Sequence, residues 1–116
     1  MHIINQNSPI PIKDQLFEYF ERLILTGALR ENEQLPSVRS LAKDLLITPN
    51  TIHKVYQELT EANLVTAIPQ KGVFVATIKK EKLDKYIEEE KKIFLSSYNN
   101  LKKLNVTKEE IIQLLN

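Results

Sequence analysis

Residues 35–59 read LPSVRSLAKDLLITPNTIHKVYQEL, and this stretch decides the fold of the chain. Counted at 100° per residue, its apolar residues fall on one stripe in each of two short segments. The spacing therefore predicts two short amphipathic helices whose inner faces share one core. The stripes consist of Val38, Leu41, Ala42 and Leu45 in the first helix, and of Ile52, Val55, Tyr56, Leu59 and Ala62 in the second.

Residues that favour helix starts mark where both helices begin. Ser37 is expected to be the N-cap of the first helix and Thr48 that of the second, because their hydroxyls can accept a hydrogen bond from a first-turn N–H. Pro49 then takes the first helical position, where its missing N–H does no harm. The junction falls at about residues 46–48, which predicts a tight helix-turn-helix.

The outward side of the second helix carries polar residues whose first members can hydrogen-bond to base edges or phosphates. Any surface helix is polar on its outer face, so this pattern alone is equally consistent with a solvated helix. His53 fits an ordinary surface histidine at least as well as a DNA contact. The outward residues are Asn50, His53, Lys54, Gln57 and Glu61.

The flanking segments complete a small domain. Residues 11–27 predict a helix that begins near Pro11 and stops at Gly27, with Ile12, Leu16, Phe20, Leu23 and Ile24 directed inward. Residues 64–68 and 73–78 are β-prone runs around a turn that contains Pro69 and Gly72. A hairpin in this place is a wing, and we expect its tip, residues 70–72, to contact the DNA backbone or the minor groove. The alternative is that the hairpin only closes the core.

From Glu81 onward no glycine or proline interrupts a helix of about 22 residues, roughly 33 Å long. Thr107 and Glu110 then form a capping-box pattern that predicts a last helix. Because the winged unit can close its own core, we expect the apolar side of this tail to pack against a second copy. The alternative is that the last helix folds back on the long one as an isolated hairpin. The expected interface residues are Leu83, Ile87, Phe94, Tyr98, Leu101, Leu104, Ile111 and Leu115.

The composition excludes several classes of protein. A chain of 116 residues with 42% hydrophobic and 27% charged residues suits one globular domain with an extension. It has no cysteine and two widely separated histidines, so we expect no metal site and no cofactor. No nucleophile can be paired with a base, and two glycines cannot form a phosphate loop, so an enzyme is not expected. The chain lacks a signal peptide and a membrane-spanning apolar run, which predicts a cytoplasmic protein.

The net charge of +1 is low for a nucleic-acid-binding domain, but the local balance is more basic. Between residues 36 and 56, Arg39, Lys43 and Lys54 outnumber the one anion, Asp44. Between residues 71 and 85, five lysines face two acidic residues. These two basic zones are compatible with DNA binding. The near-neutral total leaves open an alternative function, a winged-helix protein-interaction module without specific DNA binding.

Five motifs resemble the GntR family of bacterial transcription regulators and, within it, the short YtrA-type subfamily. They are PIKDQL at residues 11–16, ILTGAL at 24–29, LPSVRSLA at 35–42, TPNTIHKVYQEL at 48–59 and the wing sequence KGVFV at 71–75. This resemblance covers nearly all of the first 78 residues. It implies a mainly helical fold with a small hairpin, in which residues 1–78 form a winged helix-turn-helix DNA-binding domain and residues 79–116 a short helical dimerisation region.

The same resemblance implies a homodimeric transcription repressor that reads a pseudo-palindromic operator in double-stranded DNA. It implies DNA contacts for Arg39, for the recognition surface and for the wing. From the residues themselves, Arg39 could instead be a solvated helix cation or pair with Asp44. Ser37, Thr48 and Thr51 could serve in capping as well as in phosphate contact. The predicted DNA-binding set is Ser37, Arg39, Thr48, Asn50, Thr51, His53, Lys54, Lys71 and Gly72.

Several positions depart from the family pattern. Asn32 and Asn63 stand where glycine is common, and asparagine tolerates the left-handed conformation better than most residues. Leu46 replaces a glycine in the turn, and Gln70 replaces the first wing glycine, which puts a side chain at the tip. Lys54 stands where arginine is frequent and lacks its bidentate fork.

The sequence names no effector. The tail is too short to enclose a pocket of several hundred Å³ by itself. We therefore expect any small-molecule effector to bind between subunits or between the wing and the tail.

Overall fold

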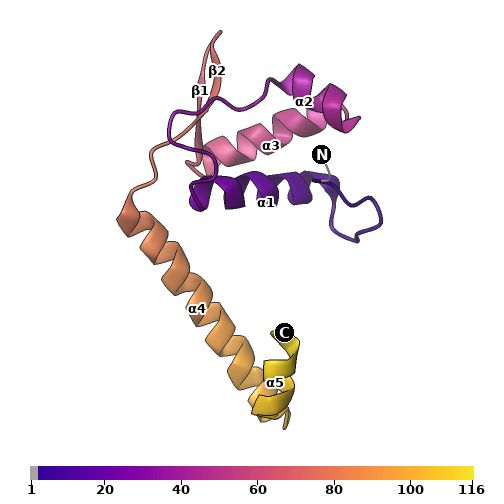
Figure 1. The fold of residues 1–116 in the computed structure, drawn as a ribbon, viewed down its shortest axis with the longest axis vertical. Coiled ribbons are helices and arrows are strands. Elements are labelled where there is room, and N and C mark those ends of the chain that lie inside the picture. Colours follow the sequence, from indigo (N-terminus) through magenta and orange to yellow (C-terminus); the bar gives the residue numbers. More distant parts are fainter. Residues whose placement is uncertain (1–2) are drawn as a thin grey trace. The chain divides into compact units, whose positions relative to one another are not determined.

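The computed structural model describes residues 3–116, and within that range it contains five helices and one two-stranded hairpin (Figure 1). The mainly helical fold with a small hairpin is the one predicted from the sequence. The chain divides into two compact units, residues 1–78 and 79–116. Among the described residues, no helix is both long and apolar enough to cross a membrane.

Three helices build the core of the first unit, namely α1 (Ile12–Leu25), α2 (Val38–Leu45) and α3 (Pro49–Glu61). The residues of the stripes predicted from the spacing are all buried or half-buried. Phe20 of α1 meets Tyr56 of α3 edge to face, with ring centroids 6.0 Å apart. The buried helical residues are Leu16, Phe20, Ile24, Leu41, Ala42, Ile52, Val55, Tyr56 and Leu59.

Both predicted starts of the helix-turn-helix are at the expected residues, but only one hydroxyl acts as a cap. The Ser37 Oγ accepts a hydrogen bond from the Ser40 N–H at 3.1 Å. Thr48 precedes α3 and Pro49 opens it, yet the Thr48 side chain caps no backbone N–H. Its hydroxyl lies 2.9 Å from the Thr51 hydroxyl instead. The prediction of side-chain capping by Thr48 is therefore wrong, because the two threonines satisfy each other.

The wing consists of β1 (Val65–Ile68) and β2 (Gly72–Val75), paired antiparallel with Val65 opposite Val75. The second strand is shorter than the predicted run to Ile78. The Ala76 N–H still donates to the Leu64 carbonyl at 3.0 Å, in the same register as the pairing of Val65 with Val75, but no backbone bond joins residues 77 and 78 to the hairpin within the described residues.

The outer edge of β2 is occupied by the segment before α2, which the sequence did not predict to pair. The Leu35 N–H donates to the Val73 carbonyl at 2.8 Å, and the Val75 N–H donates to the Glu33 carbonyl at 2.9 Å. Gln34 forms a bridge with Phe74 between these two bonds. The segment that connects α1 to α2 is therefore attached directly to the wing.

The residues that replace family glycines adopt the backbone conformation in which glycine is favoured. Asn32, Leu46, Asn63 and Gln70 have φ values of 67°, 56°, 60° and 64°. The prediction that Asn32 and Asn63 tolerate the left-handed region is confirmed. Leu46 and Gln70 adopt it without the help of a short amide side chain, so both positions carry backbone strain.

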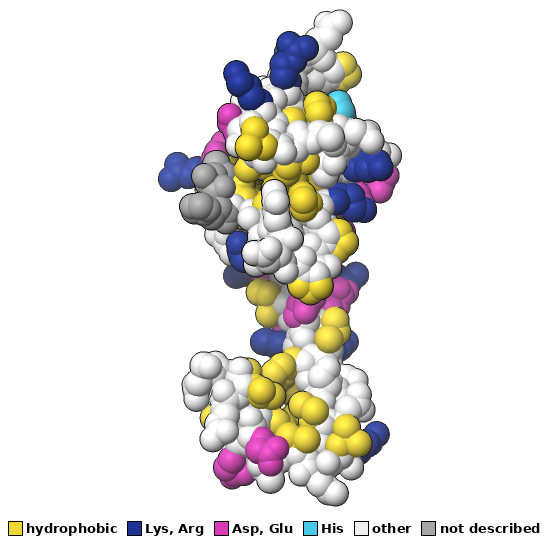
Figure 2. Space-filling view, turned by 90° about the vertical axis from the view of Figure 1, so that its right-hand side faces the viewer, with side chains coloured by type: hydrophobic (Ala, Val, Ile, Leu, Met, Phe, Trp, Pro, Cys, Tyr) yellow, Lys and Arg dark blue, Asp and Glu magenta, His cyan; other side chains and the backbone are white. Residues whose placement is uncertain are grey.

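The second unit contains α4 (Lys80–Lys103) and α5 (Lys108–Leu114). Thr107 caps α5 as predicted, because its Oγ1 accepts the Glu110 N–H at 3.2 Å. No residue of α4 is buried, and of the tail residues only Ile111 is. Hydrophobic side chains gather on the face of this unit that Figure 2 shows.

Candidate nucleic-acid interface

The outward face of α3 presents polar side chains that have no partner within the described residues. Asn50, His53 and Lys54 are exposed, and their side chains make no hydrogen bond or ion pair in residues 3–116. Gln57 and Glu61 are engaged with each other, since the Gln57 Nε2 donates to the Glu61 carboxylate at 3.4 Å. The donors and acceptors of the other three side chains are free to bind a ligand.

The opposite face of α3 fixes which residues point outward. Ile52, Val55 and Leu59 are fully buried, so the helix cannot rotate without exposing its core contacts. The Lys13 Nζ of α1 also donates to the Glu58 carboxylate at 2.6 Å, and this bond raises the pKa of Lys13. Packing and an ion pair together hold the outward face in one orientation.

The start of α2 provides a second exposed group. Ser37 and Arg39 are both exposed, and no ion pair joins Arg39 to Asp44 among the described residues, so the alternative of a pair with Asp44 is not seen. The Tyr56 hydroxyl donates to the Pro36 carbonyl at 2.7 Å and ties the start of α2 to α3. Burial raises the pKa of Tyr56 well above its ordinary value, which keeps the hydroxyl protonated as a donor. The sequence identified Tyr56 as a core residue but not this bond.

The wing tip is a tight turn. The Lys71 N–H donates to the Ile68 carbonyl at 3.0 Å, with Pro69 second and the left-handed Gln70 third in the turn, which is the type II pattern. The side chains of Gln70 and Lys71 are exposed. Gly72 follows with a φ of 130°, a conformation that other residues rarely adopt.

Gln34 contacts this turn from the connecting segment. Its Nε2 donates to the Lys71 carbonyl at 3.0 Å, across 37 residues of sequence. Sequence reasoning missed Gln34, because it lies in a polar stretch without periodicity. A signal could have come only from knowing that residues 32–35 pair with β2.

The predicted DNA-binding residues lie on three neighbouring elements of the first unit. Helix α2 packs on α3, and α3 contacts β1 of the wing (Figure 1). Two members of the set are less available than expected. Thr51 is half-buried and bonded to Thr48, and Gly72 is half-buried beside Gln34.

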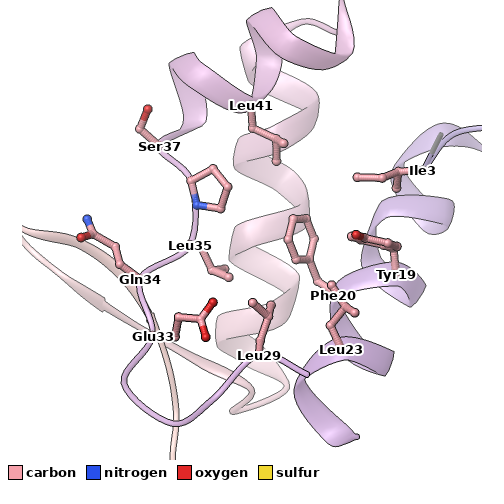
Figure 3. Close-up of a pocket in the computed structure, with 11 residues that line it drawn as sticks. Ile3, Tyr19, Phe20, Leu23, Leu29, Glu33, Gln34, Leu35, Ser37 and Leu41 are labelled. Carbon is pink, nitrogen blue, oxygen red and sulfur yellow. The ribbon is translucent and has the colours of Figure 1, made fainter. Parts of the chain in front are cut away.

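A cavity of about 510 Å³ opens on the first unit between α1 and the segment that leads into α2. Figure 3 shows Phe20 and Leu23 of α1 lying close to Leu29 and Leu35 of that segment. Glu33 is the only charged residue in the lining, which is otherwise mostly apolar. In the part of the chain that the structure describes, no three His, Asp or Glu side chains gather as metal ligands would.

The sequence and the fold match known regulatory proteins. Residues 12–75 match the profile of the family described as bacterial regulatory proteins, gntR family. The chain is 32% identical over 73 residues to the HTH-type transcriptional repressor YtrA of Bacillus subtilis, which is 63% of this chain and 56% of YtrA. It thus spans little more than half the length of that relative.

Two further comparisons extend into the tail. The chain is 30% identical over 105 residues to the uncharacterised HTH-type transcriptional regulator YhcF of Bacillus subtilis, covering 90% of this chain and 83% of YhcF. A crystal structure of a Listeria monocytogenes protein described as a transcriptional antiterminator superposes with a TM-score of 0.76 at 30% identity. That match covers 99% of this chain and 87% of the other.

Proposed function

This chain belongs to the GntR family of bacterial regulatory proteins, and from that membership we propose that it is a cytoplasmic, homodimeric repressor that reads a pseudo-palindromic DNA operator. Membership in a family of regulatory proteins also confirms the prediction that the chain is not an enzyme. The name of YtrA as a transcriptional repressor supports repression as the direction of control.

The observation that carries the proposal is the set of unpartnered polar side chains at the start of α3. Asn50 and Lys54 are exposed while the other side of the same helix is fully buried. An amide can pair with an adenine edge, and an ammonium can contact a guanine or a phosphate. A helix held in this way suits the major groove.

Affinity and specificity come from different parts of this surface. Ser37 and Thr48, at the two helix starts, and the cations Arg39 and Lys71 suit phosphates, which set register but carry no sequence information. The side chains of Asn50 and Lys54 suit base edges. In this proposal the wing adds a contact through Lys71, with Gln70 limiting how deeply the tip enters the minor groove.

We assign residues 1–78 to DNA binding and residues 79–116 to dimerisation. The exposed hydrophobic side chains of α4 and α5 support the second assignment, because they lack cover within the tail itself. A symmetric dimer presents two recognition helices to half-sites about one helical turn, roughly 34 to 36 Å, apart. Selection of bound duplexes from a randomised pool gives the operator and its half-site spacing.

A salt titration with a selected duplex tests DNA binding directly. Each neutralised phosphate contributes about −0.9 to the slope of log affinity against log salt concentration. We expect a clearly negative slope for the parent protein. A slope near zero contradicts the proposal.

Two substitutions test the residue assignment. Arg39→Ala and Lys54→Ala are each expected to weaken operator binding, by about 1 to 3 kcal/mol where the removed side chain bonds to a base edge. The unfolding midpoint is expected to stay unchanged in both variants. Lys92→Ala on α4 is the matched control, because it removes one exposed cation outside the DNA-binding unit. If both test variants bind as tightly as the control, the assignment is wrong.

The near-neutral net charge of +1 favours one other candidate, a protein-interaction module that presents α3 to another protein. Retention of the purified chain on random-sequence duplex DNA at low salt separates the two functions. A DNA-binding protein is retained and elutes with salt, whereas the interaction module passes through.

A further inference from the structure

The wing tip is held from outside the hairpin by one side chain. The Gln34 Nε2 donates to the Lys71 carbonyl at 3.0 Å, and the backbone on either side of Gln34 pairs with β2. Because Glu33 and Leu35 are fixed by backbone bonds, the Gln34 side chain starts from a defined position. The bond is therefore part of a built contact between the α1–α2 connection and the wing.

Gly72 keeps open the space through which this side chain passes. A methyl group on Gly72 would lie 2.5 Å from the Gln34 Nε2, well inside van der Waals contact. Gly72 also has a φ of 130°. The residue that follows Lys71 thus permits both the backbone path of the tip and the approach of the Gln34 amide.

The tip needs such support because its own turn is strained. A type II turn places its third residue in the left-handed region, where glycine is normal, and here that residue is Gln70. A non-glycine residue costs roughly 1 to 2 kcal/mol in this conformation, which favours other arrangements of the tip. A hydrogen bond to the next carbonyl offsets part of that cost.

We propose that Gln34 is a positioning residue for DNA binding, which holds the strained wing turn so that the Lys71 ammonium meets a phosphate. This role rests on the proposed function and deepens it. Gln34 itself touches no DNA in this proposal. It acts through Lys71, and its removal releases the tip.

The test uses Gln34→Met, which keeps the length of the side chain and removes the donor without adding charge. In the parent protein, nitrogen-15 relaxation of residues 70–72 is expected to give order parameters near the ~0.85 of rigid backbone. In Gln34→Met they are expected to fall towards ~0.6 at the tip and to stay unchanged in α3. Equal order parameters in both proteins overturn the proposal, whether or not the chain binds DNA.

DNA binding gives the second readout, with the selected operator as the probe. Gln34→Met is expected to weaken binding about three- to tenfold and to flatten the salt slope by about 0.9 for each phosphate that is no longer neutralised. Lys71→Ala is expected to weaken binding and flatten the salt slope to the same extent, because it removes the charge itself. In the double variant the two effects are expected not to add, because both act on the same phosphate.

The outcomes separate this proposal from the broader one. If the parent shows no salt-dependent binding, the proposal of DNA binding is contradicted. The relaxation result still decides whether Gln34 holds the wing tip. If the parent binds and the effects of Gln34→Met and Lys71→Ala are fully additive, Gln34 does not act through Lys71. Gly72→Ala provides a second variant, expected to flatten the salt slope as Gln34→Met does, because its methyl group displaces the Gln34 amide and strains the backbone of the tip at a φ of 130°.

Discussion

Leu46, in the turn of the helix-turn-helix, has a strained backbone conformation that the turn between α2 and α3 requires. It ends α2 with a φ of 56°, and 90% of its surface is exposed, so burial of its side chain does not offset the energetic cost of this backbone conformation. Leu46→Gly is expected to raise the free energy of unfolding by about 0.5 to 1 kcal/mol. This gain is the strain energy that glycine removes, minus the extra conformational entropy that glycine loses on folding. Urea unfolding measures the change.

Leu46→Ala is the matched control, because alanine shortens the side chain but keeps the same backbone penalty. Its stability is expected to stay close to that of the parent. A glycine variant no more stable than the alanine variant would show that the turn is not strained.

Tyr56 links stability to alkaline pH. Its pKa is raised by burial above the ordinary tyrosine value of about 10, so the unfolded chain loses this proton at a lower pH than the folded protein. Stability from Tyr56 is therefore complete below about pH 10 and is lost as the pH rises further, by at most about 1.4 kcal/mol per pH unit.

Tyr56→Phe removes this slope together with the bond to the Pro36 carbonyl, a loss of about 1 kcal/mol near neutral pH. Denaturant unfolding between pH 8 and 11 compares the two proteins, and their stabilities are expected to converge as the pH rises. Parallel curves through this range would contradict the assignment.

For individual residues, the sequence predicted backbone conformations better than it predicted hydrogen bonds between side chains and distant residues. The left-handed asparagines, Asn32 and Asn63, could be predicted because they stand where the family pattern has glycine. The bonds of Gln34 and Tyr56 could not, since each joins residues at least 20 positions apart through one donor. Periodicity detects which face is apolar, whereas a single long-range hydrogen bond leaves no periodic trace.

At the scale of elements, the two helix starts are expected to differ in their sensitivity to substitution. Ser37→Ala removes a side-chain cap from α2 and should cost about 1 kcal/mol of stability. Thr48→Ala removes a hydroxyl that caps nothing and should cost less. Thermal unfolding of both variants measures the contrast, and equal losses would contradict it.

Ser37→Asp serves as a rescue, because a carboxylate can also accept the Ser40 N–H. It separates capping from DNA contact. The variant is expected to unfold like the parent but to bind DNA more weakly, since a negative charge now faces the predicted phosphate site.

Element boundaries followed from the sequence where periodicity was strong. The spans of α1, α2 and α3 and the turn at residues 46–48 agree with the predicted pattern. The wing was less well predicted, because residues 77 and 78 are β-prone but form no backbone bond to the hairpin within the described residues. The pairing of residues 32–35 with β2 was missed, since a polar stretch of four residues has no strand signature.

At the scale of the whole molecule, the proposed dimerisation depends on the tail. Phe94 and Leu104 have 52% and 73% of their surface exposed within the chain, and Ile93 and Leu95, outside the predicted set, are exposed as well. The exposed apolar surface of α4 is thus broader than the predicted interface set. Ile111, a member of the predicted set, is buried within its own chain, so it has little surface left to contact a second copy.

Phe94→Ser is expected to weaken the dimer at least about 30-fold, the effect of losing about 2 kcal/mol at an interface. Sedimentation equilibrium measures the change, with Ser96→Ala on the same helix as the control. Operator affinity should fall in parallel, since two recognition helices then bind independently. A parent protein that sediments as a monomer at high micromolar concentration would refute dimerisation through this surface.

The pairing of residues 32–35 with β2 also bears on solubility. An unpaired strand edge is a template on which other chains can add, and short hairpins usually offer two such edges. Here the outer side of β2 is already occupied, which leaves within the described residues the four residues of β1 and the short segment around Gln34 as open edges. Templates so short, next to a lysine-bearing turn, should resist fibril growth even at the concentrations that crystallisation demands.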